Sequence, residues 1–278
     1  MWYRIARGVA ALALITVTAA CGNAEDRGGA SVESAELALE QSTLTAQIDT
    51  LVADAADLNS RFDIGQGFEA AAEQLQLQLN VAVPCATVVR QGSTLAIVYD
   101  AIGIPCAYHG RQLAGWHTVR VMRNADNEVN VHHEFADFRD TRVSLSGSAD
   151  VTWSRTSGSR RVEHAVSYTV LQGASAGWLG ESYGDSTQLT LDDGVRINGL
   201  RTWSSAHGSY MLDMKAIEQR FADGVPQLGA YDLTTPENEA LTLAFGRIDT
   251  DNIRVIIQGA QRDLSFVLRA DGETVSPQ

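Results

Sequence analysis

The chain has 278 residues and is acidic, because 34 Asp and Glu against 21 Lys and Arg give a formal net charge of −13 at pH 7. This charge argues against nucleic acid as a partner, since phosphate backbones bind basic surfaces. It also leaves no polybasic segment for anionic lipid headgroups. After residue 20, no apolar run approaches the roughly 20 residues that a transmembrane helix needs.

Residues 1–20 have the pattern of a signal peptide. Arg4 and Arg7 precede an apolar run from Val9 to Val17, and Thr18-Ala19-Ala20 stand directly before Cys21. The run is too short to span a bilayer, and the small residues indicate a cleavage site. The segment resembles the lipobox signal of bacterial lipoproteins, whose cysteine becomes the first mature residue and is acylated on its amine and its sulfur. The alternative is an ordinary secretory signal cut near Ala20.

This resemblance implies a lipid anchor at Cys21, because two or more acyl chains hold a protein stably on a membrane. Gly22, rather than Asp, follows the cysteine, which in the better-studied lipoproteins implies transport to the outer membrane. Residues 21–30 are short, polar and glycine-containing, as in a flexible tether. Removal of residues 1–20 removes two arginines and no acid, so the net charge changes to −15.

Two further cysteines, Cys85 and Cys106, form an even pair once Cys21 is taken by lipid. In an oxidising envelope such a pair predicts a disulfide. Two buried free thiols or a metal pair are the alternatives. The sequence has no nearby C-x-x-C and no histidine at ligand spacing, which argues against metal.

Residues 31–80 are rich in Ala, Leu, Gln and Glu and are expected to be helical. A seam with 4,3,4,3 spacing is formed by Leu37, Leu44, Ile48, Leu51, Ala55 and Leu58. We favour an amphipathic helix packed on its own sheet over an oligomerisation seam through residues 37–58. After Gly65-Gln66-Gly67, residues 68–80 fit a second helix, but alternation from Leu75 to Val83 leaves a strand open as well.

Residues 81–278 show a period of two almost throughout, which predicts antiparallel strands. The expected strands are 94–100, 115–123, 128–138, 142–153, 160–171, 188–191, 195–203, 209–217 and three C-terminal runs between 241 and 268. The predicted fold is therefore mainly β: one large antiparallel meander, as a sandwich or an open or closed barrel, preceded by one or two N-terminal α-helices.

An internal repeat lies within this β domain. The pattern V-x-[LI]-x-G begins at Val143 and again at Val195, and each copy leads to T-W-S-x-x-x-G-S around Trp153 and Trp203. Each copy is typical of a strand, a turn and a return strand. The two tryptophans are candidate binding residues, although tryptophan at a strand end is more often a packing residue.

The stretch from Thr94 to Val121 contains Tyr99-Asp100, Cys106, Gly110-Arg111 and Gly115. It resembles a hairpin of uncharacterised β-rich lipoproteins of bacterial envelopes, which carry D-x-G-C followed by G-R-x-x-x-G. The turn is longer here than in those proteins. The resemblance implies the same compartment and fold and brings no known activity.

Three groups of residues are candidates for chemistry. Gly173 to Gly177 matches G-x-S-x-G with Ser175 as nucleophile, but the sequence after it does not predict the required helix. Asp249 and Asp251 fit a hairpin turn, since the Gly and distal Glu of a calcium loop are absent.

The third constellation is His132-His133-Glu134, in which His132 and Glu134 share one face of a strand. These two residues resemble two-thirds of a metal triad, and a third ligand would come from His109, His117, His164 or His207. A hydrogen-bonded or solvated His/Glu pair is the favoured interpretation.

The sequence therefore predicts a lipid-anchored, non-enzymatic envelope protein without a cofactor, which binds or carries an apolar ligand or an envelope protein. Such a carrier needs one apolar sheet face left open. The alternatives are a structural or assembly role through the heptad helix and a metal-dependent or serine hydrolase.

Overall fold

The computed structural model describes residues 29–58, 67–100, 103–108, 110–123, 128–153, 160–171, 176–188, 194–220, 223–272 and 274–277. Residues 1–28, which include Cys21, lie outside this description. The helices are α1 (Val32–Leu58) and α2 (Phe68–Ala82). The strands are β1 (Thr87–Gln91), β2 (Thr94–Val98), β3 (Cys106–Tyr108), β4 (Arg111–Arg123), β5 (Val129–Arg139), β6 (Val143–Trp153), β7 (Arg160–Val170), β8 (Ala176–Gln188), β9 (Gly194–Ser205), β10 (Gly208–Arg220), β11 (Leu228–Thr234), β12 (Ala240–Arg247), β13 (Asn252–Gln258), β14 (Leu264–Arg269) and β15 (Thr274–Pro277).

The strands form one antiparallel sheet in which consecutive strands of the chain pair, except that β2 pairs with β4 and not with β3. The path runs from β1 through β2 and β4 to β15, and β3 pairs with β4 beside this path. β1 and β15 are its two ends, and the sheet is not closed. The predicted antiparallel meander is confirmed in its open form, whereas the sandwich and the closed barrel are wrong.

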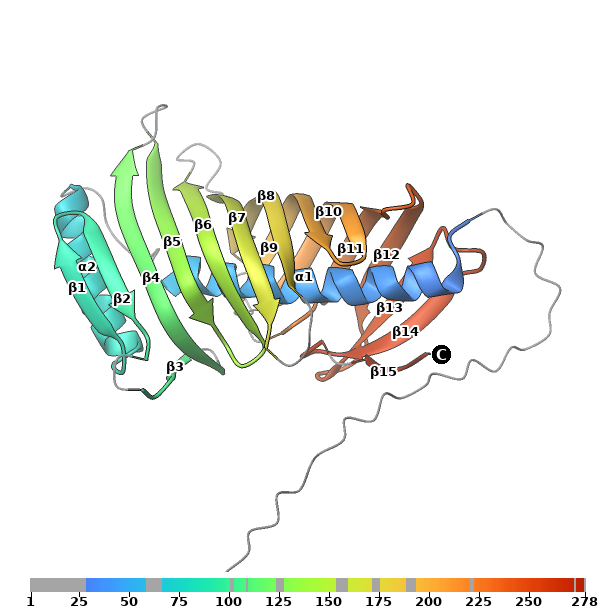
Figure 1. Ribbon diagram of the computed structural model, residues 1–278, viewed down its shortest axis with the longest axis horizontal. Coiled ribbons are helices and arrows are strands. Elements are labelled where there is room, and N and C mark those ends of the chain that lie inside the picture. Colours follow the sequence, from blue (N-terminus) through green and yellow to red (C-terminus); the bar gives the residue numbers. More distant parts are fainter. Residues whose placement is uncertain are drawn as a thin grey trace, which may run out of the picture.

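The sheet curves around α1, which runs across the strands (Figure 1). We call the face covered by α1 the inner face and the opposite one the outer face. β13 shows how the sequence separates them: Ile253, Val255 and Ile257 are buried, whereas Arg254 and Ile256 are exposed. This alternation is the period of two of a strand with one face in a core.

The α1 helix is enclosed by the sheet along most of its length. Every residue from Gln41 to Ala56 is buried or half-buried. The seam residues Ile48, Leu51 and Ala55 are each at most 2% exposed and belong to the main hydrophobic core. The heptad pattern thus serves packing within the chain, as in the favoured interpretation.

The α2 helix covers the β1 end of the sheet, so the strand considered for residues 75–83 is wrong. Ala71, Leu75 and Leu79 are buried at helical spacing, whereas Leu77 and Val81 are exposed. The alternating leucines and valines therefore lie on two opposite sides of one helix. Neither of the two described helices has an apolar stretch that would cross a bilayer.

The predicted disulfide is present and links the chain just before β1 to β3 at the β1 end of the sheet. Cys85, just before β1, is bonded to Cys106 in β3, with the two Cα atoms 5.6 Å apart. Cys106 is fully buried. The two bonded cysteines are 21 positions apart, and the segment between them contains the first hairpin.

One predicted strand is misplaced. Residues 188–191 were expected to form it, whereas the structure has the longer β8 ending at Gln188, and residues 189–193 lie outside the described part. β8 carries three glycines and no run of alternating apolar residues. Its pairing with β7 and β9 on both sides supplies the order that its own sequence does not indicate.

Two β-bulges bend the sheet, and each is held by a hydrogen bond to a side chain of the internal repeat. The bulge residues Asp137 in β5 and Ala216 in β10 have positive φ angles of 49° and 50°. The amide of Asp137 donates to Ser146 Oγ at 3.0 Å, and the amide of Ala216 donates to Asn198 Oδ1 at 2.8 Å. Ser146 and Asn198 occupy the same position in the two copies of V-x-[LI]-x-G. The repeat therefore marks equivalent points of curvature.

Candidate functional site

The His132-His133-Glu134 segment lies in β5, and its side chains alternate between the two faces. His132 Nδ1 lies 3.0 Å from Asp150 Oδ1, and its Nε2 lies 3.6 Å from Glu134 Oε1, on the outer face. His133 lies on the inner face, where its Nδ1 is 2.9 Å from His117 Nε2. Among the described residues, no three or more His, Cys, Asp or Glu side chains are grouped as a metal site.

The other histidines considered as third ligands do not join His132. His117 pairs with His133 on the inner face, and His164 contacts α1. His207 is exposed in the turn between β9 and β10, and His109 lies outside the described residues.

The remaining two constellations have simple structural contexts. Ser175 lies outside the described residues, and the chain continues directly into strand β8, not into the helix of a nucleophile elbow. Asp249 and Asp251 lie in the predicted turn, where Asp249 Oδ1 accepts hydrogen bonds from the amides of Asp251 and Asn252, each at 2.9 Å.

The two repeated tryptophans both contribute to packing. Trp203 is 1% exposed, and its ring stacks on Tyr210 across the β9–β10 hairpin with centroids 4.9 Å apart. Trp153 is half-buried against the core. Trp203 is thus inaccessible from the outer face, and it faces the side of the sheet that α1 covers.

The most unusual chemistry lies between α1 and the inner face, in a group that we call the Asp49 cluster: Thr45, Asp49, His164 and Arg201. Asp49 of α1 forms an ion pair with Arg201 of β9, and its Oδ1 lies 2.7 Å from His164 Nε2 of β7. Arg201 also donates to Thr45 Oγ1 at 3.3 Å. Arg201 is only 1% exposed, so a full guanidinium charge is buried under the helix.

Burial sets the protonation of this cluster. It lowers the pKa of His164 to about 4, so the imidazole is neutral at pH 7 and its Nε2–H donates to the Asp49 carboxylate. Burial also lowers the pKa of Arg201, whose guanidinium lies 5.7 Å from the centre of the Tyr231 ring. Asp49 thus supplies the negative charge that balances Arg201.

Further polar contacts hold the same helix. Arg111 Nε of β4 lies 2.9 Å from Asp54 Oδ2 of α1, and Arg111 Nη1 donates to Asp140 Oδ2 at 2.8 Å. Gln219 of β10 donates to Thr50 of α1. The helix is therefore fixed by ions, amides and hydroxyls in addition to apolar packing.

Several buried polar atoms of this interface have no hydrogen-bond partner within the described structure. They include Arg201 Nε and Trp203 Nε1, which are both donors on the inner side of β9, and Gln41 Oε1 of α1. Unsatisfied buried polar groups are rare in stable cores and each one costs free energy. The contact between α1 and the sheet is thus polar and incompletely satisfied.

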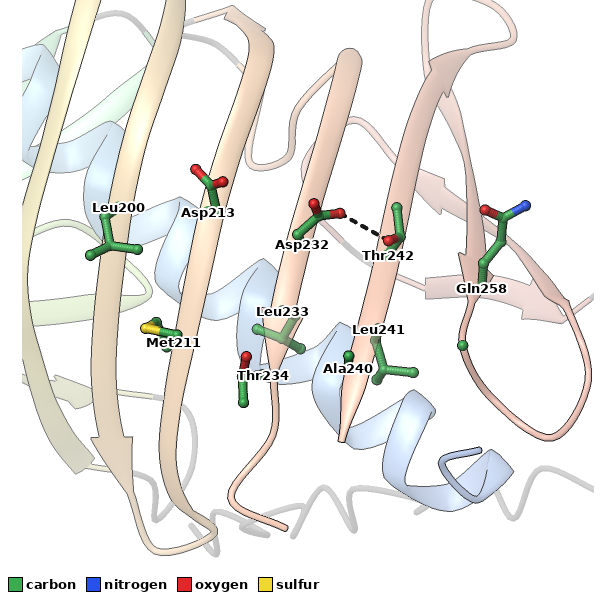
Figure 2. A pocket seen from close by; sticks show the side chains of 11 residues that line it. Leu200, Met211, Asp213, Asp232, Leu233, Thr234, Ala240, Leu241, Thr242 and Gln258 are labelled. Carbon is green, nitrogen blue, oxygen red and sulfur yellow. Dashed lines mark hydrogen bonds between the residues drawn. The ribbon is translucent and has the colours of Figure 1, made fainter. Parts of the chain in front are cut away.

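The outer face carries a second candidate, an open hollow of about 400 Å³ across β9 to β13 (Figure 2). Leu200 and Met211 supply apolar surface, and Asp213 and Asp232 line it. Lys215 bonds to Asp232 and lies 3.9 Å from Asp213. Hydrogen bonds from Lys215 and from a threonine lower the pKa of Asp232. Lys215 balances only one of the two aspartates, so the hollow combines apolar contact with a residual negative charge.

Sequence reasoning did not select the Asp49 cluster. Its two helix residues and its two strand residues are more than a hundred positions apart in the chain, since Asp49 and His164 differ by 115 positions. A partial signal exists in Arg201, which lies two residues before Trp203 and therefore on the same, buried face of a strand. A charge at an inward-facing position indicates a buried partner.

No family model matches this chain, and neither a curated protein nor a solved structure does.

Proposed function

We propose that the chain is a lipid-anchored, non-enzymatic binding module of the bacterial envelope, which takes up an apolar ligand on the inner face of its sheet. The lipobox-like end of residues 1–20 supports the anchor. A carrier with an open apolar face was expected, whereas α1 covers that face. We therefore treat α1 as a cover that is displaced from the inner face when ligand binds.

The observation that carries the proposal is the composition of the contact between α1 and the sheet. The buried residues of α1 up to position 56 are five alanines, five polar residues and only four large apolar ones. They are Ala35, Ala38, Ala46, Ala55 and Ala56; Gln41, Ser42, Thr45, Thr50 and Asp54; and Leu39, Ile48, Leu51 and Val52.

Such a helix is a weak partner for an apolar surface. Alanine removes little area from water, and each buried polar group exchanges hydrogen bonds with water for bonds within the protein at small net gain. The inner face, by contrast, presents large apolar side chains such as Leu212, Leu243 and Val255. An acyl chain has no polar groups along its length, so it would contact them without burying the polar side chains that α1 buries.

The alternatives have less support. An assembly role through residues 37–58 would need seam residues that are buried inside the chain. A hydrolase would need His132 and Glu134 in a pocket, whereas they lie on the outer face and Glu134 is 66% exposed.

The test is hydrogen exchange of a Cys21→Ala chain with and without monoolein, a neutral single-chain lipid. We expect faster exchange of the α1 amides on binding, with the β13 and β14 amides unchanged. Failure of monoolein and of other single-chain lipids to bind, or binding with α1 fully protected, would contradict the proposal.

A cross-link gives the matched control. Ser34 Oγ in the first turn of α1 donates to Glu239 Oε2 at 2.7 Å. Ser34→Cys with Glu239→Cys, joined by a short bismaleimide, should hold α1 in place and reduce binding, whereas the same variant without cross-linker should bind like the parent.

A further inference from the structure

The Asp49 cluster divides its charges unequally between the cover and the sheet. Asp49 and Thr45 belong to α1, whereas Arg201 and His164 belong to β9 and β7. If α1 leaves the inner face, the acid leaves with it and the basic groups stay. The uncovered face then has one guanidinium without an acid in its floor, that of Arg201, because Arg111 keeps its bond to Asp140.

A wholly apolar ligand would fit this floor poorly. Arg201 is 1% exposed under α1, and a ligand lying in the same place would bury it again. A buried guanidinium without a counter-charge is strongly unfavourable, because neither water nor an acid compensates its lost hydration. The ligand must therefore bring an anion of its own.

Within the described residues, two of the unpartnered groups on this floor are donors, whereas His164 Nδ1 is an unpartnered acceptor. Arg201 Nε and Trp203 Nε1 have no acceptor within the described structure, and both lie on the inner side of β9. His164 Nε2–H joins them once Asp49 is withdrawn. Arg201 and His164 converge on Asp49, so without Asp49 their donors, one of them charged, match a group that only accepts hydrogen bonds.

We propose that the ligand is a long-chain carboxylate, whose head replaces the Asp49 carboxylate at Arg201 and whose chain lies along the inner face. This inference rests on the proposed function and specifies its ligand. Asp49 acts as a stand-in: it has the charge, the planar shape and the acceptor atoms of a fatty acid head. Arg201 pairs well with such a group because a guanidinium donates two parallel hydrogen bonds to a carboxylate.

The experiment compares three ligands with the same eighteen-carbon chain type on the Cys21→Ala chain: oleate, neutral monoolein and cationic oleylamine. We expect oleate to bind most tightly. Arg201→Met should weaken oleate by about 10- to 100-fold and leave monoolein within about twofold, because it removes one charged hydrogen-bonding group and keeps the apolar volume. Asp49→Asn should tighten oleate, since the competing carboxylate is gone.

Matched variants keep the result interpretable. Arg196→Met is the control, because Arg196 lies on the same strand, pairs with Glu218 and is 52% exposed on the outer side. If Arg201→Met alone does not fold, Asp49→Asn combined with Arg201→Met removes both members of the ion pair and should bind monoolein while losing the preference for oleate.

The outcomes separate the two proposals. Equal affinity for oleate and monoolein, or oleate binding that Arg201→Met leaves unchanged, overturns the carboxylate and keeps the apolar site. Binding of none of the three ligands overturns the proposed function as well. Oleate binding with unchanged exchange of the α1 amides would place the ligand on another surface and overturn this inference.

Discussion

His117 and His133 face each other on the inner sides of β4 and β5, with Tyr99 Oη 3.3 Å from His117 Nδ1. Both imidazoles are fully buried and lie beside Phe135. Burial lowers the pKa of His117 to about 3. Burial also holds the pKa of His133 well below its usual value, and electrostatic repulsion from His117, His132 and Arg160 lowers it further. The folded protein therefore keeps both rings neutral at pH 7.

This pair should make stability fall in acid. The unfolded His117 side chain binds a proton below pH 6.5, whereas the folded one does so only near pH 3, so its contribution to stability is fully present above pH 6.5 and is lost as pH falls toward 3. His133 acts in the same direction. At pH 5 the loss from His117 is about 2 kcal/mol. Urea unfolding at pH 7.5 and pH 5 should show that His117→Phe with His133→Phe removes this part of the pH dependence. His207→Phe, at an exposed turn position, should leave it unchanged; equal acid sensitivity of both variants would refute the argument.

Among single residues, the sequence predicted the features that depend on the number of cysteines or on neighbouring positions in the chain. Cys85 and Cys106 pair as their even number indicated, and Asp249 forms its turn from neighbouring amides. The Asp49 cluster could not be predicted from the sequence, because its ion pair forms only when α1 packs across strands β7 and β9. No spacing along the chain encodes that contact.

Among the elements, the bulged strands β5 and β10 determine how the sheet bends around α1. A glycine of the adjacent strand faces each bulge: a Cβ on Gly115 would lie 2.1 Å from the Asp137 carbonyl oxygen, and one on Gly229 would lie 2.5 Å from that of Ala216. Both glycines have positive φ angles, 93° and 104°. Close approach and backbone conformation thus both require glycine there.

Gly229→Ala should therefore destabilise the protein by about 2 kcal/mol, from the clash and the left-handed φ together. Gly246 on the next strand, β12, is the matched control, because a Cβ there would meet nothing within 4 Å. Gly246→Ala is expected to change the free energy of unfolding by less than about 0.5 kcal/mol. Denaturant unfolding of the two variants measures the difference, and equal effects would show that the bulge does not depend on Gly229.

Elements with a clear period were predicted well and those without one were not. β13 and β14 follow from alternating apolar residues, and α1 from its heptads. β8 was missed because its glycines and polar residues interrupt alternation, and α2 was ambiguous because Leu75 to Val83 satisfies both periods. Neighbouring elements resolve both cases: β8 pairs on two sides, and α2 buries Leu75 and Leu79.

On the scale of the whole molecule, α1 runs across the strands of the sheet from its β13 end toward its β1 end (Figure 1). Just before α1, Ala30 is fixed to the turn after β13, since its amide donates to the Gly259 carbonyl oxygen at 3.1 Å and its own carbonyl oxygen accepts from the Gln261 amide at 2.8 Å. The elements α2 and β1 lie at the opposite end of the molecule (Figure 1).

A lipid on Cys21 would therefore orient the molecule on a membrane. Cys21 precedes Ala30 by nine residues, which span at most about 30 Å when extended, so the turn between β13 and β14 should lie near the bilayer and β1 far from it. A fluorophore on Arg262→Cys should be quenched by spin-labelled phospholipids, whereas one on Gln91→Cys, exposed beside the β1–β2 turn, should not. Cys21→Ala should abolish quenching at Arg262→Cys and release the protein from membrane pellets. Equal quenching at both positions would contradict the orientation, and retention of the Cys21→Ala chain on membranes would contradict the anchor.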